Sequence, residues 1–118
     1  MELSIYKGAY DIADTVQNFM NVYYATHMNY LASALLTKGL SPEQINKAVS
    51  VAIKVANTSG IEAYKHFLPV FSGLREGVIQ DCKLSHLGYG LVLMNADPSV
   101  SAVSEFQVDV LRDFLNED

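Results

Sequence analysis

Three histidines and a single cysteine are the residues of this sequence best suited to bind a metal. The histidines His27, His66 and His86 are scattered, and Glu62 with His66 has the four-residue spacing that places two ligands on one helix face. Dinuclear sites in helical bundles need paired Glu-x-x-His units, and zinc sites use closely spaced His or Cys pairs. Neither pattern occurs, so the sequence predicts no metal and no cofactor.

Nucleophilic catalysis has little support in the sequence. Cys82 is expected on the inner side of a helix, where a cysteine is normally inert. There is no Gly-x-Ser-x-Gly motif, and the glycines at 88 and 90 do not continue into a phosphate-binding loop. Gly88-Tyr89-Gly90 is better explained as a bend or a close contact between helices. The sequence leans against an enzyme, although catalytic groups can converge from distant positions.

Residues 34–49 read ALLTKGLSPEQINKAV. This segment resembles helix-turn-helix regulators, which place a small residue, a glycine turn and an isoleucine at similar offsets. In those families a second turn and a recognition helix follow within a few residues. Here the helical pattern runs on to Asn57 without a Gly or a Pro. The pattern argues against nucleic acid as a partner, and a transcriptional regulator built on residues 34–49 is kept as an alternative.

Aromatic side chains gather on one uncharged stretch of the chain, which carries Tyr23, Tyr24, His27 and Tyr30. Tyr64 and Tyr89 are possible further members of this tyrosine cluster. Aromatic residues at helical spacing usually belong to a core. Tyrosine is also favoured at interfaces, because it buries a large ring while its hydroxyl stays satisfied. These four residues are therefore our candidates for a self-association surface. The alternative is a Tyr/His-lined apolar pocket of a sensor for small ligands.

Acidic residues recur every four positions near the end of the chain, at Glu105, Asp109 and Asp113. Four-residue spacing places them on one face of a helix, where like charges repel slightly. A solvated face is the ordinary explanation for such a pattern. The sharper hypothesis is a docking face for a basic protein partner.

Composition favours a small protein with a covered apolar surface. The 118 residues suit one domain spanning residues 1–118. Half of them are hydrophobic and 18% are charged, against about 25% in ordinary soluble domains. A shortage of charge at this size suggests that a second copy covers apolar surface, which predicts a homodimer.

Charge and cysteine content bear on partners and compartment. The net charge is −5, with four acids and four bases in residues 1–60 and nine acids against four bases in residues 61–118. Nucleic acids need a basic footprint, and so do anionic membranes. One cysteine fits a reducing compartment, and the N-terminus lacks the pattern of a signal peptide. We expect a cytoplasmic protein without a membrane partner.

The clearest predicted helix covers residues 11–38, and no formally charged residue lies between Thr15 and Thr37. Its length would suit a membrane span, but several Asn and Gln side chains are costly in hydrocarbon. We interpret it as a central helix covered by its own bundle or by a second subunit. Its expected apolar stripe is Ile12, Val16, Phe19, Tyr23, Tyr30 and Ala34.

The second predicted helix has clear start and stop signals. Gly39 suits the left-handed position that ends the preceding helix. Ser41 can cap, Pro42 fits the first turn, and Gln44 can complete a capping box. The inner face is expected to hold Ile45, Ala48, Val49, Ala52 and Ala56.

The second half of the chain is predicted to be helical as well. A short helix at 61–68 ends at Pro69, and a further helix covers 74–82. For residues 84–95 we favour a helix over a strand. Asp97-Pro98 is expected to open the last helix, with a buried face of Val103, Phe106, Val110, Leu111, Phe114 and Leu115.

Together these patterns predict an all-α bundle of about five helices. The alternative is an α+β fold with a small sheet from residues 3–6 and 89–94. The predicted function is that of a homodimeric protein–protein interaction, regulatory or accessory module. Compact chains with one cysteine are frequent among bacterial and phage accessory proteins, which is an association rather than an argument.

Overall fold

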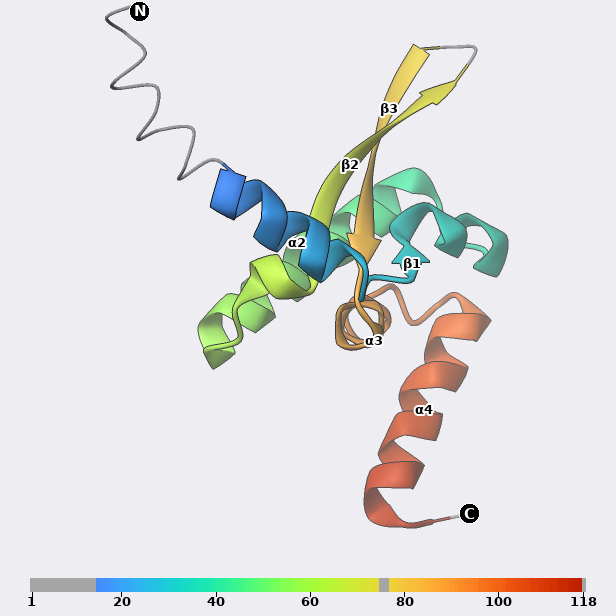
Figure 1. Cartoon of the computed structure of the whole chain (residues 1–118). Coiled ribbons are helices and arrows are strands. Elements are labelled where there is room, and N and C mark those ends of the chain that lie inside the picture. The colour runs from blue at the N-terminus through green and yellow to red at the C-terminus, as the bar shows by residue number, and fades with distance from the viewer. Residues whose placement is uncertain (1–14, 75–76, 118) are drawn as a thin grey trace, which may run out of the picture.

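The computed structural model describes residues 15–74 and 77–117 (Figure 1). It combines several helices with one small sheet, so the fold is α+β and the all-α prediction is wrong. The elements are a helix at residues 15–25, β1 (Tyr30–Leu31), the 3-10 helix η1 (Ala32–Lys38), α2 (Pro42–Ser59), the short 3-10 helix η2 (Ala63–Lys65), β2 (Phe67–Leu74), β3 (Gly77–Leu84), α3 (His86–Met94) and α4 (Ser101–Leu115).

The sheet has three antiparallel strands in the order β1-β3-β2. β2 and β3 form a hairpin whose register runs from Phe67 opposite Leu84 to Leu74 opposite Gly77, and β1 pairs with the end of β3 through Tyr30 opposite Leu84. The alternative prediction was right that a small sheet exists, but not about its strands. Residues 3–6 lie outside the described part, and residues 89–94 belong to α3.

Of the helix predicted at 61–68, only the short η2 is helical. The helix predicted at 74–82 is wrong, because Leu74 belongs to β2 and residues 77–82 belong to β3. The chain is aromatic and β-branched here, and burial alternates along β3, where Cys82 and Leu84 are buried and Lys83 is half-buried. A period of two is the signature of a strand. Pro69 does not break the element, because β2 is an edge strand and can leave one backbone donor position unused.

The predicted helix over 11–38 is also interrupted. Residues 11–14 lie outside the described part, and helix 15–25 ends in a tight turn in which the Thr26 hydroxyl donates to the Tyr23 carbonyl. Tyr30 and Leu31 then pair with β3. Pairing with a distant strand overrides the helical periodicity of this stretch, as tertiary contacts often override local preference.

The start of α2 confirms the sequence prediction. The Ser41 side chain accepts a hydrogen bond from the Gln44 backbone, and the Gln44 side chain accepts one from the Ser41 backbone, which completes a capping box. Gly39 ends η1 at φ 105°, in the left-handed region that favours glycine. The inner face of α2 buries Ile45, Ala48, Ala52 and Ala56, as predicted, with Val49 half-buried.

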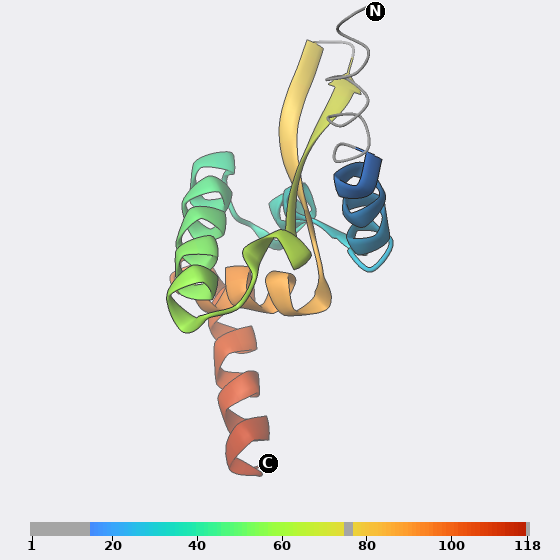
Figure 2. The ribbon, with the colours of Figure 1, turned by 60° about the vertical axis from the view of Figure 1, so that its left-hand side comes forward.

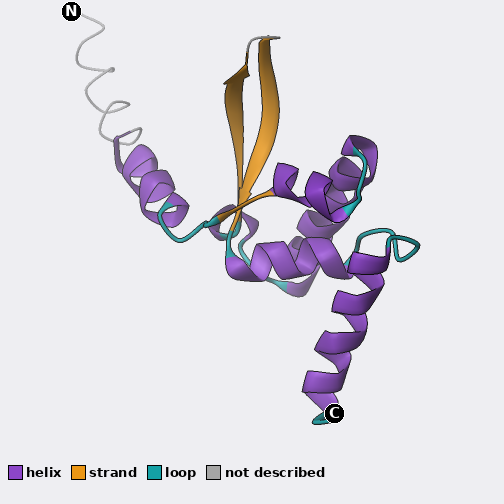
Figure 3. Ribbon diagram, turned by 90° about the vertical axis from the view of Figure 1, so that its right-hand side faces the viewer, coloured by secondary structure: helices purple, strands orange, loops and turns teal. Residues whose placement is uncertain are grey.

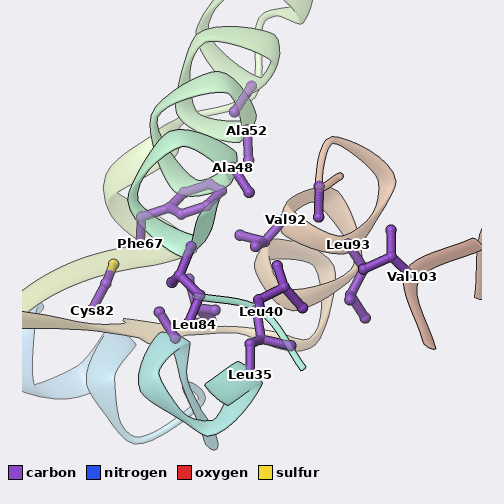
Figure 4. Close-up of a cluster of buried hydrophobic side chains, with 14 residues drawn as sticks. Leu35, Leu40, Ala48, Ala52, Phe67, Cys82, Leu84, Val92, Leu93 and Val103 are labelled. Atoms are coloured by element: carbon purple, nitrogen blue, oxygen red, sulfur yellow. The ribbon is translucent and has the colours of Figure 1, made fainter. Parts of the chain in front are cut away.

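The hydrophobic core lies where η1, α2, β3 and α3 meet (Figure 4). Leu35, Leu84, Val92 and Val103 are its fully buried large side chains, one each from η1, β3, α3 and α4. α3 is the helix that we favoured for residues 84–95.

α4 differs from its prediction in two ways. It begins at Ser101 rather than at Asp97-Pro98, and the Asp97 carboxylate instead accepts hydrogen bonds from the Ser99 backbone and side chain. α4 also extends away from the other elements (Figure 2). Val103 is buried and Phe106 half-buried, but the rest of the predicted buried face is exposed to solvent: Val110, Leu111, Phe114 and Leu115.

Among the described residues, no helix has both the length and the apolar character that crossing a membrane requires.

Candidate interaction surfaces

The four residues that the sequence grouped together form two separate clusters. Tyr23 packs edge-on against Tyr24 at 5.4 Å between ring centroids and against His27 at 5.0 Å. Tyr24 also meets Tyr64 edge-on at 5.6 Å, which connects helix 15–25 to η2. Tyr23 and His27 are exposed, whereas Tyr24 is half-buried.

Tyr30 belongs to the second cluster. Its ring stacks on Tyr89 of α3 at 4.4 Å, and its hydroxyl lies 3.1 Å from His86 Nδ1. Burial, aided by the nearby Tyr30 hydroxyl, raises the pKa of the Tyr89 phenol. The sequence offered Tyr89 only as a possible further member of the tyrosine cluster, because nothing in the spacing indicates that α3 packs beside β1.

Helix 15–25 turns an apolar stripe outward. Val16, Phe19, Val22 and Tyr23 lie within one 120° sector at 100° per residue, and all four are exposed, Phe19 at 66%. Half-buried Met20, Asn21 and Tyr24 lie on the other side. The expectation that the chain's own bundle covers this stripe is wrong, and cover by a second subunit stays a prediction.

α4 carries two stripes on different sides of the helix. At 100° per residue, Glu105, Asp109 and Asp113 share one face, and all three are exposed, as expected of a solvated or docking face. The opposite half of the helix holds exposed apolar side chains, among which Phe114 is 81% exposed. The sequence identified these residues as apolar, but it placed them in the core.

Ser85 and His66 serve the packing of the hairpin against α3. Ser85 Oγ accepts the Gly88 N–H at 2.9 Å and lies 2.7 Å from His66 Nδ1. The Ser85 N–H donates to the His66 carbonyl. Ser85 is buried at the start of α3. A serine that caps a helix in this way is occupied structurally.

Cys82 is a free thiol buried on β3. Burial raises the pKa of this thiol, and the negative charge of Asp81 adds to the effect. A raised pKa keeps the group neutral and unreactive near pH 7.

Metal-ligating side chains do not cluster in the described part of the chain. Within residues 15–74 and 77–117, no group of three or more His, Cys, Asp or Glu is placed to hold a metal ion. Two surface depressions lie along α4 at Glu105 and Arg112 and between α2 and the loop at Asp97. Neither is lined by tyrosine or histidine, so neither corresponds to the predicted sensor pocket.

Comparisons of this chain with protein-family models, with curated proteins and with solved structures found no significant match.

Proposed function

We propose that the protein is a homodimeric interaction module whose subunits pair through the apolar side of α4. The observation that carries the proposal is the change in burial along this one helix. Val103, in its first turn, is fully buried in the core, whereas Leu111, Phe114 and Leu115 project into solvent. A helix with one apolar side gains most of its stability by packing that side against something.

A second copy suits this surface because the charges of α4 lie out of the way. Glu105, Asp109 and Asp113 share the face roughly opposite to Leu111 and Phe114. When two α4 helices pack along their apolar sides, the two acidic faces point outward on opposite sides of the pair. The apolar core with a charged rim that results is the usual anatomy of a protein interface.

The outward acidic face then remains free for a second role. In the dimer it would offer two rows of carboxylates to a basic protein partner, in keeping with a regulatory or accessory module. The interface is symmetric, as expected for a pair of identical chains.

Sedimentation of the full chain over a concentration series tests the proposal. We expect a dimer for the native chain and a monomer for Phe114→Lys, because a buried unpaired ammonium is strongly disfavoured. Asp113→Lys is the matched control, since it adds a lysine at the next position but on the acidic face. It should remain a dimer.

Two results would contradict the proposal. If the native chain stays monomeric at all concentrations, the proposed dimer does not exist. If the Phe114→Lys variant dimerises as well as the native chain, α4 is not part of the interface. In that case, sedimentation of Phe19→Lys tests whether the subunits pair through the stripe on helix 15–25 instead, which was the prediction from the sequence.

A further inference from the structure

The described elements follow one another as in a helix-turn-helix with an added hairpin. η1 is joined to α2 by Gly39-Leu40-Ser41, and a three- to four-residue turn with a glycine is typical of helix-turn-helix units. β1 lies before η1 and pairs with β3 of the hairpin that follows α2. A helix, a short strand, two helices and a hairpin in this order make up a winged helix-turn-helix.

This arrangement explains why the sequence shows no turn after Val49, which was the argument against a DNA-binding helix-turn-helix. Residues 34–49 resemble a helix-turn-helix, but the pattern after Val49 continued without the turn that should precede a recognition helix. In the structure α2 is itself the second helix of the pair, because η1 is a separate helix that ends at Lys38. No further turn is needed.

The outer face of α2 carries side chains suited to reading DNA. Asn46, Lys47, Ser50 and Lys54 are all exposed and lie opposite the buried alanines. Asparagine pairs with adenine, lysine with guanine, and serine with several base edges in the major groove. The first turns of a second helix are the part that enters the groove.

The net charge differs between the part of the chain that holds α2 and the part that holds α4. Residues 15–84, from helix 15–25 to the end of the hairpin, carry six basic and four acidic residues, a net +2, and residues 1–14 carry one basic and three acidic residues, a net −2. Residues 85–118 carry one basic and six acidic residues, a net −5. Residues 1–84 are thus neutral overall, and the net negative charge of the chain comes from residues 85–118. α4 holds three of these acids and extends away from the strands and the other helices (Figure 3).

Two acids do lie near the outer face of α2. Glu43 is exposed one turn before Lys47. Hydrogen bonds from Ser99 lower the pKa of Asp97, and the positive charge of Lys47 adds a smaller effect in the same direction. A carboxylate on a recognition helix can accept from cytosine N4, whereas Asp97 is already occupied by Ser99 and Gln44.

We propose that the α2 face of this protein binds double-stranded DNA, with Asn46, Lys47 and Ser50 toward the major groove and Lys54 toward a phosphate. The proposal stands apart from dimerisation through α4, since each subunit carries its own α2 face. Two such faces in a dimer would favour a palindromic site.

Fluorescence anisotropy with a labelled 30-base-pair duplex of random sequence tests the proposal on the full chain. Non-specific DNA binding by proteins has dissociation constants of about 10⁻⁴–10⁻⁶ M at physiological salt, so the titration extends to about 100 μM protein at low and at physiological salt. We expect binding that weakens as salt rises. Lys47→Gln/Lys54→Gln should weaken it on the order of tenfold or more and flatten the salt dependence.

Lys65→Gln is the matched control. It removes one lysine, where the α2 variant removes two, and Lys65 lies on η2 and is paired with Glu62 at 2.9 Å, so binding should hardly change. Selection from a random duplex pool adds a second readout. The native chain should enrich a motif, and Asn46→Ala should lose that enrichment while it keeps its affinity for the random duplex.

Three outcomes overturn the proposal. The first is no binding up to about 100 μM at low salt, where even non-specific contacts are strong. The second is equal loss for the Lys47/Lys54 pair and for Lys65→Gln, which indicates general polyanion attraction. The third is stronger binding to single-stranded DNA or to duplex RNA of the same length, whose deep major groove a helix does not enter. Thermal unfolding of each variant by circular dichroism confirms that the proteins compared are folded.

Discussion

The Gly88 backbone lies directly against the carbonyl group of His66. A Cβ atom added at position 88 would come within 2.5 Å of the His66 oxygen. The same oxygen accepts the Ser85 N–H, and Ser85 Oγ accepts the Gly88 N–H. The start of β2 and the start of α3 are thus held together by hydrogen bonds that leave no room for a side chain.

Gly88→Ala should therefore destabilise the protein, although alanine is the better helix former. We expect a loss of about 1–3 kcal/mol in the free energy of unfolding, the usual range for overpacking. Gly90→Ala is the control in the same helix, because its added Cβ would meet Phe106 at an ordinary 3.8 Å. It should gain up to about 1 kcal/mol. Chemical denaturation measures both, and equal effects would contradict the close contact.

Two neighbouring leucines of η1 provide a test of the core. Leu35 is fully buried, whereas Leu36 is 48% exposed. Leu35→Ala should lower the free energy of unfolding by about 2–5 kcal/mol, because it removes buried methyl groups and leaves a cavity. Leu36→Ala should change it by less than about 1 kcal/mol. An equal or larger loss for Leu36→Ala than for Leu35→Ala would mean that residues 32–38 turn a different face toward the core.

The capping box of α2 can be measured separately from the core. Ser41→Ala removes the side-chain acceptor for the Gln44 N–H and should cost about 1 kcal/mol. Ser50→Ala, on the exposed side of the same helix, should be neutral or slightly stabilising, because alanine has the higher helix propensity. Thermal or urea unfolding of the two variants decides the matter. An equal response would mean that the cap contributes nothing.

Cys82 should react slowly with a thiol reagent such as Ellman's reagent in the native protein. Its thiol is buried, and the raised pKa leaves less thiolate at pH 8 than an unfolded chain would have. Above pH 9 ionisation favours the unfolded chain, since the folded thiol holds its proton to higher pH. Adding denaturant should speed the reaction strongly. Native reactivity equal to that of the unfolded chain would place Cys82 at the surface.

Local signals in the sequence determined several features of this protein. The structure confirms four features that the sequence predicted: the capping box at Ser41, the left-handed Gly39, the inner face of α2 and the helix at α3. Each depends on residues within a few positions of one another. Hydrogen bonds of that range form in any environment that leaves the segment helical, so they can be recognised without knowing the fold.

The tertiary structure alone decided the sheet and the burial of the outer helices. Tyr30 is not helical because it pairs with Leu84 of β3, which lies 54 positions further along the chain. The apolar side of α4 was correctly identified, but whether Phe114 faces a core depends on where α4 leaves the body. An amphipathic pattern states that a face needs cover, and the long-range arrangement of the chain decides what provides it.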